Sequence, residues 1–307
     1  MKKPEPKINQ ILVKIHATTV NRTDSAYVRG IPFFIRLLTG VFSPKNKIPG
    51  TEFAGIVEQV GKNISSFQPG DRVFGFTDLD AGAHAEYVVS SEENMEKIPE
   101  SVSFIQAAPA LEGFHYALNF INKVELSPES RVLVNGATGA IGSAMVQILK
   151  TQNVKITAVC KAEHADLVQS LGAERVIDFE KEDFCKEKIR YDYVFDAVGK
   201  TSFFRCFNII KKGGAYMSSD LGFLAQNMFL PLVTLLLQPL TGFRKTIAPF
   251  PVNLKESIDL AKKLMQENKY KPLIDKVLPF NKIIEAYDFV KTGKKTGNVV
   301  IEIQQPA

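Results

Sequence analysis

A glycine-containing turn between a predicted strand and a predicted helix points most directly to chemistry. Residues 132–134 form an apolar run typical of a buried parallel strand. Ala137, Gly139 and Gly142 then follow the spacing G-x-G-x-x-G, with alanine replacing the first glycine. In that pattern the middle glycine lets backbone approach a pyrophosphate, and the last lets the helix pack against its strand. The alternative is an ordinary strand-to-helix turn.

The helix that begins in this turn predicts a phosphate site, because its free amide groups and dipole favour anions. Ile141, Met145, Ile148 and Leu149 recur at the spacing of one apolar helical face. The turn residues expected to bind a dinucleotide are Gly136, Ala137, Thr138, Gly139, Ala140, Ile141 and Gly142.

Lys161 indicates which nicotinamide cofactor is bound. NAD-specific sites usually place an acid at the end of the second strand, about 20 residues past the glycines, to hold the ribose 2′-hydroxyl. Lys161 stands at that position and would favour the 2′-phosphate of NADPH. His164 would assist, whereas Glu163 would oppose this if it pointed inward. A solvated lysine is the alternative, so NADPH is expected, with NADH as the second candidate.

After the turn, strands and helices alternate, as is typical of a doubly wound parallel sheet in an α/β protein. The pattern predicts a helix over 165–171, with Gly172 placed to end it. The expected strands are 154–159, 175–178, 191–196, 215–219 and 244–248. Residues Asp196 to Gly199 follow one of these strands at the carboxyl edge, where ligands bind in such sheets.

The segment before the turn is predicted to be β-structure with irregular loops. Alternation over 11–16 suits a strand with one solvated side. The other expected strands are 55–61, 71–75, 83–89 and the closing strand 298–303, and the expected late helices are 254–267 and 283–290.

Two apolar segments stand outside this pattern. Residues 31–42 are unusually apolar for a connection, and they predict either a short core helix or a flap over an apolar substrate. Residues 228–240 contain Pro231 and Pro239 and are too short to span a bilayer, so a buried or pocket-lining helix is expected.

Composition excludes several classes of protein. The apolar fraction of 45% and charged fraction of 23% are typical of a soluble globular chain, and 307 residues allow two domains. The net charge of +5 is spread without a long basic run, which gives nucleic-acid binding little support. No apolar segment follows Lys2 and Lys3, so no secretory signal is expected. Three cysteines fit a reducing compartment, and a cytoplasmic location is predicted.

With these residues in view, the chain resembles the zinc-free medium-chain dehydrogenase/reductases of the quinone oxidoreductase, or zeta-crystallin-like, branch. The resemblance covers nearly the full length in family order. The matching pieces are VNRTDSAYVRG (20–30), IPGTEFAGIVEQVG (48–61), FQPGDRVFGF (67–76), GAHAEYVV (82–89), GATGAIGSAMVQILK (136–150), SLGAERVIDF (170–179), YDYVFDAVG (191–199) and KTGNVVIEI (295–303).

The resemblance implies a GroES-like catalytic domain over 1–112 and 249–307, enclosing a Rossmann cofactor domain at 113–248. Members of the family usually carry a further β-hairpin ahead of the position of Met1, so either the true start lies upstream of Met1 or the β-domain lacks one edge. A homodimer formed through the edge of the cofactor sheet is a further expectation from the family. By the same resemblance, the residues expected near the cofactor beyond the turn are Ala197, Val198, Gly199, Leu221, Gly222 and Asn298.

No zinc is expected, because the ligand positions carry the wrong residue types. Alcohol dehydrogenases of the same superfamily place a cysteine where Asn21 stands and a histidine where Thr51 stands. Zinc prefers thiolate and imidazole to either of these side chains. Residues 111–116 hold no cysteine, and three cysteines cannot form a four-cysteine structural site.

Without a metal to polarise a simple carbonyl, a conjugated acceptor is the expected substrate. A quinone or an α,β-unsaturated carbonyl spreads the developing charge itself, and the cofactor supplies the hydride. Asn21 and Thr51 are the candidates to face the reacting end. Asn21 would donate a hydrogen bond to the substrate oxygen, or it would satisfy local backbone as a turn residue. Tyr27 is a candidate proton donor, although an aromatic in this loop more often packs.

Three functions therefore compete. An NADPH-dependent quinone or enone reductase leads. The second is another zinc-free dehydrogenase or reductase on the same scaffold. The third is an NADPH-binding protein with little turnover that acts as a structural or interaction partner.

Overall fold

The chain forms two compact units. A computed structural model describes residues 2–30, 40, 46–222, 225–250 and 253–303. One unit comprises Met1–Glu112 with Asn253–Ala307, and the other comprises Gly113–Val252. Apart from Gly40, the apolar segment 31–42 lies outside the described residues.

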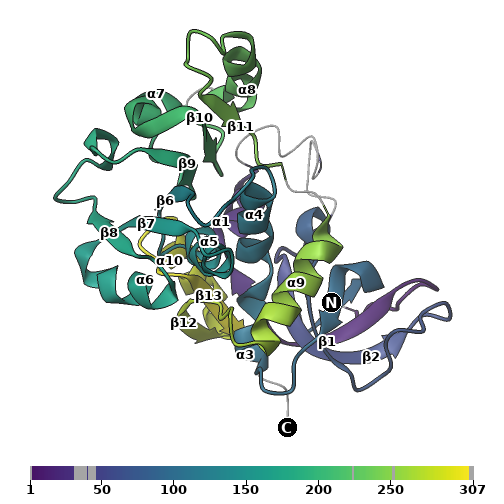
Figure 1. Ribbon diagram of the computed structural model, residues 1–307. Helices are drawn as coiled ribbons and strands as arrows, with labels where there is room; N and C mark the ends of the chain where they lie inside the picture. The colour runs from purple at the N-terminus through teal and green to yellow at the C-terminus, as the bar shows by residue number, and fades with distance from the viewer. Residues whose placement is uncertain (1, 31–39, 41–45, 223–224, 251–252, 304–307) are drawn as a thin grey trace. The chain divides into compact units, whose positions relative to one another are not determined.

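The first unit is built on a seven-stranded, mostly antiparallel sheet (Figure 1). Its central strand pairs on one side with the second strand and on the other with the last strand of the chain. The strands are β1 (Ile11–Val20), β2 (Glu52–Val60), β3 (Arg72–Phe76), β4 (Tyr87–Ser90), β5 (Met95–Lys97), β12 (Ile274–Pro279) and β13 (Asn298–Glu302). They lie in the order β12-β13-β1-β2-β3-β5, and β4 pairs with β1.

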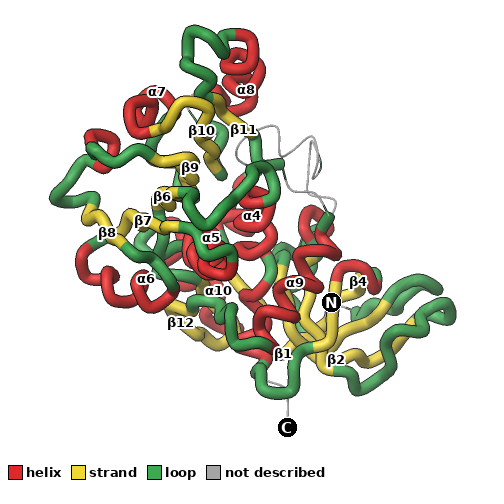
Figure 2. The backbone as a smooth tube through the Cα atoms, viewed as in Figure 1, coloured by secondary structure: helices red, strands yellow, loops and turns green. Residues whose placement is uncertain are grey.

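The helices of the first unit are short, and Figure 2 separates them from the strands by colour. They are α1 (Arg22–Arg29), α3 (Phe104–Ala107), α9 (Leu254–Gln266) and α10 (Ile283–Lys291), with 3-10 turns at Asp78–Asp80, Glu92–Asn94, Ala108–Ala110 and Phe280–Lys282. The buried side of α10 packs on β1 and β13 through Ala286 and Val290.

The expectation of one solvated side on β1 is wrong. Leu12 is buried, and His16 is half-buried because the ring of Phe104 stacks on its imidazole, with 4.5 Å between the ring centroids. Helix α3 thus contacts the face of β1 that alternation assigned to solvent. A period-two pattern cannot anticipate cover from a helix some ninety residues later in the chain.

The second unit is a six-stranded parallel sheet. Its strands are β6 (Arg131–Asn135), β7 (Lys155–Cys160), β8 (Arg175–Asp178), β9 (Tyr191–Asp196), β10 (Ile210–Ser218) and β11 (Lys245–Ile247), in the order β11-β10-β9-β6-β7-β8. The order reverses between β6 and β9, as in Rossmann folds, where ligands bind at the carboxyl ends of the strands. The fold is therefore α/β, with a Rossmann-like parallel sheet in one unit and a β-sheet of the GroES-like kind in the other.

Helices connect the strands of the second unit. They are α4 (Glu112–Ile121), whose first residue belongs to the other unit, α5 (Ala140–Thr151), α6 (Ala165–Leu171), α7 (Phe203–Cys206) and α8 (Gln226–Leu236), with 3-10 turns at Ala162–His164, Phe184–Lys186 and Phe207–Ile209. Eight consecutive residues of α5, Gly142 to Leu149, are buried. No helix within the described ranges is long and apolar enough to cross a membrane.

Of the two alternatives for residues 228–240, the buried helix is wrong, whereas the pocket-lining helix stays a prediction. Helix α8 forms there, but only Leu230 and Thr234 of its eleven residues are buried. Phe229, Leu232 and Leu236 are exposed. The apolar composition of this segment led to the prediction of burial. A helix that packs through one stripe of residues leaves its other side chains exposed to solvent, whatever their type.

Candidate functional site

Two glycines of the turn after β6 are required by the protein itself. Gly136 has a φ of +79°, in the left-handed region that favours glycine. A Cβ on Gly142 would lie 2.1 Å from the carbonyl oxygen of Gly136. Any side chain at Gly142 would therefore push helix α5 away from the turn.

Gly139 is different, because the protein leaves room beside it. A Cβ at Gly139 would meet only the Gly136 oxygen, at an ordinary 3.5 Å, and its φ of −74° suits any residue. As N-cap of α5 it offers no side chain to the first amide groups of the helix. Ala137 is buried, whereas Thr138, Ala140 and Ile141 are half-buried around this space. The cradle fits the pyrophosphate of a dinucleotide.

A second loop meets the turn at the carboxyl end of β9 and is organised by Asp196. This fully buried carboxylate accepts hydrogen bonds from Asn135 Nδ2 at 2.9 Å and from Tyr216 Oη at 3.0 Å. It also accepts from the backbone amides of Val198 at 3.3 Å and Gly199 at 3.0 Å. Asp196 thus fixes Ala197, Val198 and Gly199 beside the turn, where a Cβ on Gly136 would meet the side chain of Val198.

A third loop, after β10, lies against the second. A Cβ on Gly199 would lie 2.3 Å from the Cβ of Asp220. The Asp220 carboxylate accepts from the Gly222 amide at 2.9 Å, and the carbonyl of Leu221 accepts from the Asn227 amide. The structure therefore brings together the turn residues, 197–199 and 221–222, all at one edge of the parallel sheet.

Lys161 lies at the end of β7 and begins a 3-10 turn. Its ammonium pairs with the carboxylate of Glu180 at 3.0 Å, and both side chains are about half exposed. This ion pair, with Asp178 and Glu163 also nearby, raises the pKa of Lys161. His164 ends the same 3-10 turn, and its Nε2 lies 3.5 Å from Glu163.

The first unit holds a buried polar cluster around Asn21 and Thr51. Asn21 Nδ2 lies within donating distance of Glu52 Oε2 at 3.1 Å and Glu112 Oε2 at 3.2 Å. Lys295 Nζ donates to Asn21 Oδ1 at 3.3 Å. The amide of Asn21 is therefore engaged on both sides by charged groups.

Thr51 bridges two carboxyl groups of this cluster. Its hydroxyl lies 3.5 Å from Asp24 Oδ1 and 3.3 Å from Glu112 Oε2. One hydroxyl proton serves only one acceptor at a time, and a proton on either carboxyl would let that carboxyl donate to the Thr51 oxygen instead. Burial raises the pKa of Asp24 to about 7 and that of Glu112 to about 7. The cluster therefore stores a proton near neutral pH.

Glu52 stands apart within this cluster, because four donors surround its carboxylate. Oε1 accepts from the amides of Leu111 and Glu112, and Oε2 accepts from Thr19 Oγ1 and Asn21 Nδ2. Burial, then the neighbouring Glu112 carboxylate, raises its pKa to about 8, and these donors oppose that shift. Glu52 thus ties the end of β1 to the start of α4.

Two predicted site residues of the first unit have other partners. Tyr27 is buried, and its hydroxyl donates to the carbonyl oxygen of Asn46 at 2.9 Å. Asn298 Nδ2 donates to the carbonyl oxygen of Leu273 at 3.0 Å, while its buried Oδ1 has no partner among the described residues. Only Asn21 and Thr51 of the predicted catalytic set are brought together.

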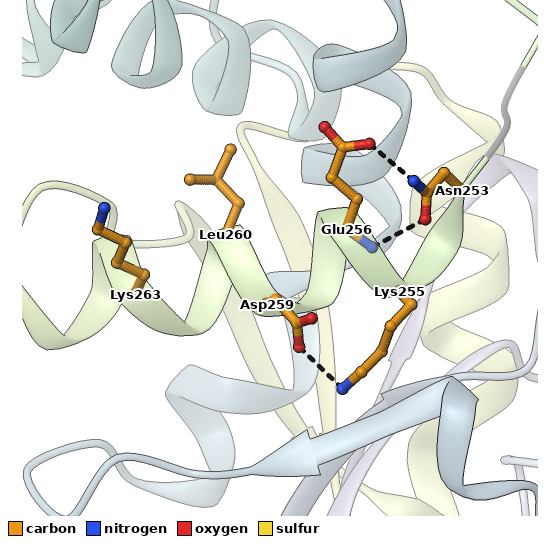
Figure 3. A pocket seen from close by; sticks show the side chains of 6 residues that line it. All are labelled: Asn253, Lys255, Glu256, Asp259, Leu260 and Lys263. Carbon is orange, nitrogen blue, oxygen red and sulfur yellow. Dashed lines mark hydrogen bonds and ion pairs between the residues drawn. The ribbon is translucent and has the colours of Figure 1, made fainter.

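A surface hollow along α9 is not a site of chemistry. Its volume is about 530 Å³, and its lining residues are Asn253, Lys255, Glu256, Asp259, Leu260 and Lys263 (Figure 3). Lys255 pairs with Asp259 at 2.8 Å, and Asn253 caps the helix by accepting from the Glu256 amide at 3.1 Å. These polar groups are used in local ion pairing and capping.

The donor set around Asn21 and Thr51 does not suit zinc. Its members are carboxyl, amide, hydroxyl and ammonium groups, and Lys295 places a cation against the amide. Among the described residues, no group of three or more His, Cys, Asp or Glu side chains could hold a metal ion.

Sequence reasoning missed the carboxyl groups of Glu112 and Asp24 and the ammonium of Lys295 as members of this cluster. The spacing of three from Asn21 to Asp24 gave one usable signal, because Asp24 closes a capping box with the Asn21 amide. Glu112 and Lys295 gave none, since only the folded sheet brings positions so far apart in sequence together.

The comparisons with known proteins agree with this architecture. Residues 7–100 match the family described as alcohol dehydrogenase GroES-like domain, and residues 171–301 match the one described as zinc-binding dehydrogenase. A 2-methylene-furan-3-one reductase from Solanum lycopersicum is 29% identical, covering 97% of this chain and 73% of that protein. A quinone-oxidoreductase homolog from Spinacia oleracea is 29% identical, covering 97% and 91%.

A third relative and a solved structure extend the comparison. An NADPH-dependent alkenal/one oxidoreductase from Arabidopsis thaliana is 28% identical over 97% of this chain and 73% of its own. The solved quinone oxidoreductase from Coxiella burnetii superposes with a TM-score of 0.86 at 23% identity, covering 99% of this chain and 93% of that one. The chain belongs to the medium-chain dehydrogenase/reductase family, in its quinone oxidoreductase branch.

Proposed function

We propose that this protein is an NADPH-dependent reductase that transfers hydride to a quinone or to the β-carbon of an α,β-unsaturated aldehyde or ketone, without zinc. The open cradle at Gly139 carries the nucleotide part of the proposal, because the space beside this glycine serves no contact within the protein. The relatives named for alkenal/one and quinone reduction support the acceptor class.

The chain's own residues would hold the cofactor at three loops of one sheet edge. The α5 amides after Gly139 would bind the pyrophosphate. The backbone of 197–199 and 221–222 would line the nicotinamide side. NADPH, when bound, supplies the hydride. Asn298, predicted to approach the cofactor, belongs to the other unit and stays a prediction.

Lys161 would bind the 2′-phosphate after releasing Glu180. Loss of a hydrogen bond between charged groups is expected to weaken binding roughly ten- to hundredfold. Lys161→Ala is therefore expected to raise the KM for NADPH by about that factor and to leave the KM for NADH unchanged. Glu180→Gln is the matched control, and it should lower the KM for NADPH because it frees the ammonium. An unchanged preference in Lys161→Ala would remove Lys161 from the phosphate site.

The cluster around Thr51 is the proposed proton source for the reduced substrate. Glu112 or Asp24 would give its proton through the Thr51 hydroxyl, and solvent would restore it. Asn21 would position Glu112 rather than donate to the substrate, because its Nδ2 already faces two carboxyl groups. Tyr27 is the less favoured donor, since its proton is committed to Asn46.

The assay is NADPH oxidation with 1,2-naphthoquinone, a short 2-alkenal and the matching saturated aldehyde. Turnover with the conjugated acceptors and little with the saturated one is expected. Tight NADPH binding without turnover on all three would favour the non-enzymatic alternative. Activity confined to the saturated aldehyde would favour a different dehydrogenase.

Three coarser expectations complete the proposal. The two compact units would correspond to the GroES-like catalytic domain and the Rossmann cofactor domain. A homodimer would form through an edge of the cofactor sheet. A cytoplasmic location stays a prediction of the sequence, whereas the names of several relatives place those proteins in chloroplasts or mitochondria.

A further inference from the structure

Two of the three cysteines lie with their sulfur atoms in contact in the second unit. Cys185 belongs to the 3-10 turn Phe184–Lys186, and Cys206 is the last residue of α7. Their Sγ atoms are 3.7 Å apart. A disulfide has an S–S distance of about 2.05 Å, so closing the pair needs an approach of under about 2 Å. Both cysteines lie in very short helical elements, which can shift more easily than a strand of the sheet.

The two thiols differ in access and in acidity. Cys185 is 8% exposed, whereas Cys206 is fully buried. The hydrogen bond from Cys206 lowers the pKa of Cys185 to about 7 and raises the pKa of Cys206 far above its usual range. Arg205, held by Asp183 at 3.2 Å, adds positive charge near Cys185. The accessible sulfur is therefore also the one that ionises, as an attacking thiol requires.

We propose that Cys185 and Cys206 form a dithiol that peroxide oxidises to a disulfide. The Cys185 thiolate attacks one peroxide oxygen, the O–O bond breaks, and a sulfenic acid and one water form. The Cys206 sulfur then attacks the sulfenic sulfur, the S–OH bond breaks, and the Cys206 proton passes to the departing hydroxyl, which leaves as a second water. Two thiols and one hydrogen peroxide thus give one disulfide and two waters, and a dithiol reductant reverses the change.

Thr201 connects this pair to the loop that follows β9. Its hydroxyl lies 3.6 Å from Cys185 Sγ and 3.5 Å from Cys206 Sγ. Its amide donates at 3.2 Å to Asp196, whose carboxylate also holds Val198 and Gly199. Drawing the sulfurs together displaces their contacts with Thr201 and loosens this loop. Oxidation would therefore weaken NADPH binding, a consequence that rests on the proposed function, whereas the disulfide does not.

The first test is mass spectrometry of the full-length protein after hydrogen peroxide, digested without reduction. A peptide linking Cys185 to Cys206, lost on treatment with dithiothreitol, is expected. Cys160 is the internal control, because burial raises the pKa of its thiol to about 11 and it should stay reduced. Sulfinic or sulfonic acid at Cys185 without a cross-link would overturn the proposal, as would equal oxidation of Cys160.

Single variants separate the two steps. Cys206→Ser should leave a sulfenic acid at Cys185 that dimedone traps, whereas Cys185→Ser should leave Cys206 reduced. Each variant's melting temperature in the reduced state should match the parent, and Cys160→Ser should still form the cross-link. Trapping of a sulfenic acid at Cys206 in Cys185→Ser would contradict the assigned order.

The second test is NADPH affinity before and after oxidation. A several-fold rise in Kd on oxidation, reversed by dithiothreitol and absent in Cys185→Ser, is expected. Unchanged affinity in a fully cross-linked sample would overturn the coupling through Thr201. Failure of the reduced protein to bind NADPH would contradict the proposed function, while the cross-link in the peptide map would still stand.

Discussion

Replacing Glu112 with glutamine should stabilise the protein at pH 8 and change little at pH 5. Burial raises the pKa of Glu112 from 4.5 to about 7. Between pH 4.5 and pH 7 the folded state therefore binds more protons than the unfolded state. The stability that the bound proton on Glu112 contributes is present below pH 4.5 and is lost as pH rises through 7. A difference of one pKa unit corresponds to about 1.4 kcal/mol, so the shift of Glu112 limits the stability lost at high pH to about 3 kcal/mol.

Glutamine fits this position without titrating. Its oxygen would accept from Asn21 Nδ2, and its amide would face the Thr23 hydroxyl, which donates to Glu112 in the parent. Because Asp24 and Glu52 share the cluster and relax with it, we expect Glu112→Gln to gain about 1–3 kcal/mol at pH 8. Lys295 limits the gain, since its charge favours the Glu112 carboxylate.

Urea unfolding followed by circular dichroism at pH 5 and pH 8 measures this difference. Glu100→Gln, at an exposed carboxylate, is the matched control and should show no pH-dependent change. An equal loss of stability at both pH values would refute the reasoning, because it would mean that Glu112 is ionised and well paired. A parent protein that gains stability from pH 5 to pH 8 through this cluster would refute it as well.

Three further predictions concern the cofactor edge and the metal. Gly139→Ala should leave the melting temperature unchanged and weaken NADPH binding at least tenfold. Gly142→Ala places a Cβ 2.1 Å from the Gly136 oxygen, so it should lower the stability by about 1–3 kcal/mol as well. Equal effects of the two variants on stability and binding would contradict the assignment of Gly139 to the ligand. Asp196→Asn should lower stability by about 1–3 kcal/mol and weaken NADPH binding. A neutral amide cannot accept all the hydrogen bonds that the carboxylate accepts, which come from Asn135, Val198, Gly199, Thr201 and Tyr216. Unfolding and binding measurements that match the parent would exclude a role of Asp196 in fixing this loop. Elemental analysis of the purified protein should find no stoichiometric zinc, and one zinc per chain would contradict the metal-free account.

The sequence predicted the parallel sheet well because its signals are local. The predicted helix 165–171 and strands 175–178 and 191–196 coincide with α6, β8 and β9. In a sheet covered on both sides, short apolar runs bounded by glycine or polar residues mark each strand without knowledge of its neighbours. The glycine spacing likewise places the turn, because its backbone needs are set within a few residues.

The buried cluster could not be predicted to the same depth. Asn21 and Thr51 were found through positions typical of zinc ligands in related dehydrogenases. The partners that define their chemistry lie far away in the sequence: Glu112 begins α4, and Lys295 lies in the loop before β13. A single sequence does not show which carboxyl groups share a proton, since that depends on distances of about 3 Å across the fold. The exposure of α8 was not predicted for a similar reason. An apolar composition does not show which side of a helix packs against the rest of the protein.

Transfer of deuterium from C4 of the NADPH nicotinamide to a 2-alkenal is the most direct test of zinc-free hydride transfer to a conjugated acceptor. The protein would first be dialysed against a chelator, and the product analysed by mass spectrometry and NMR. We expect deuterium at the β-carbon of the saturated aldehyde, at a rate that chelation does not change. Product without deuterium at that carbon, or activity that is lost on chelation and restored by zinc, would contradict this expectation.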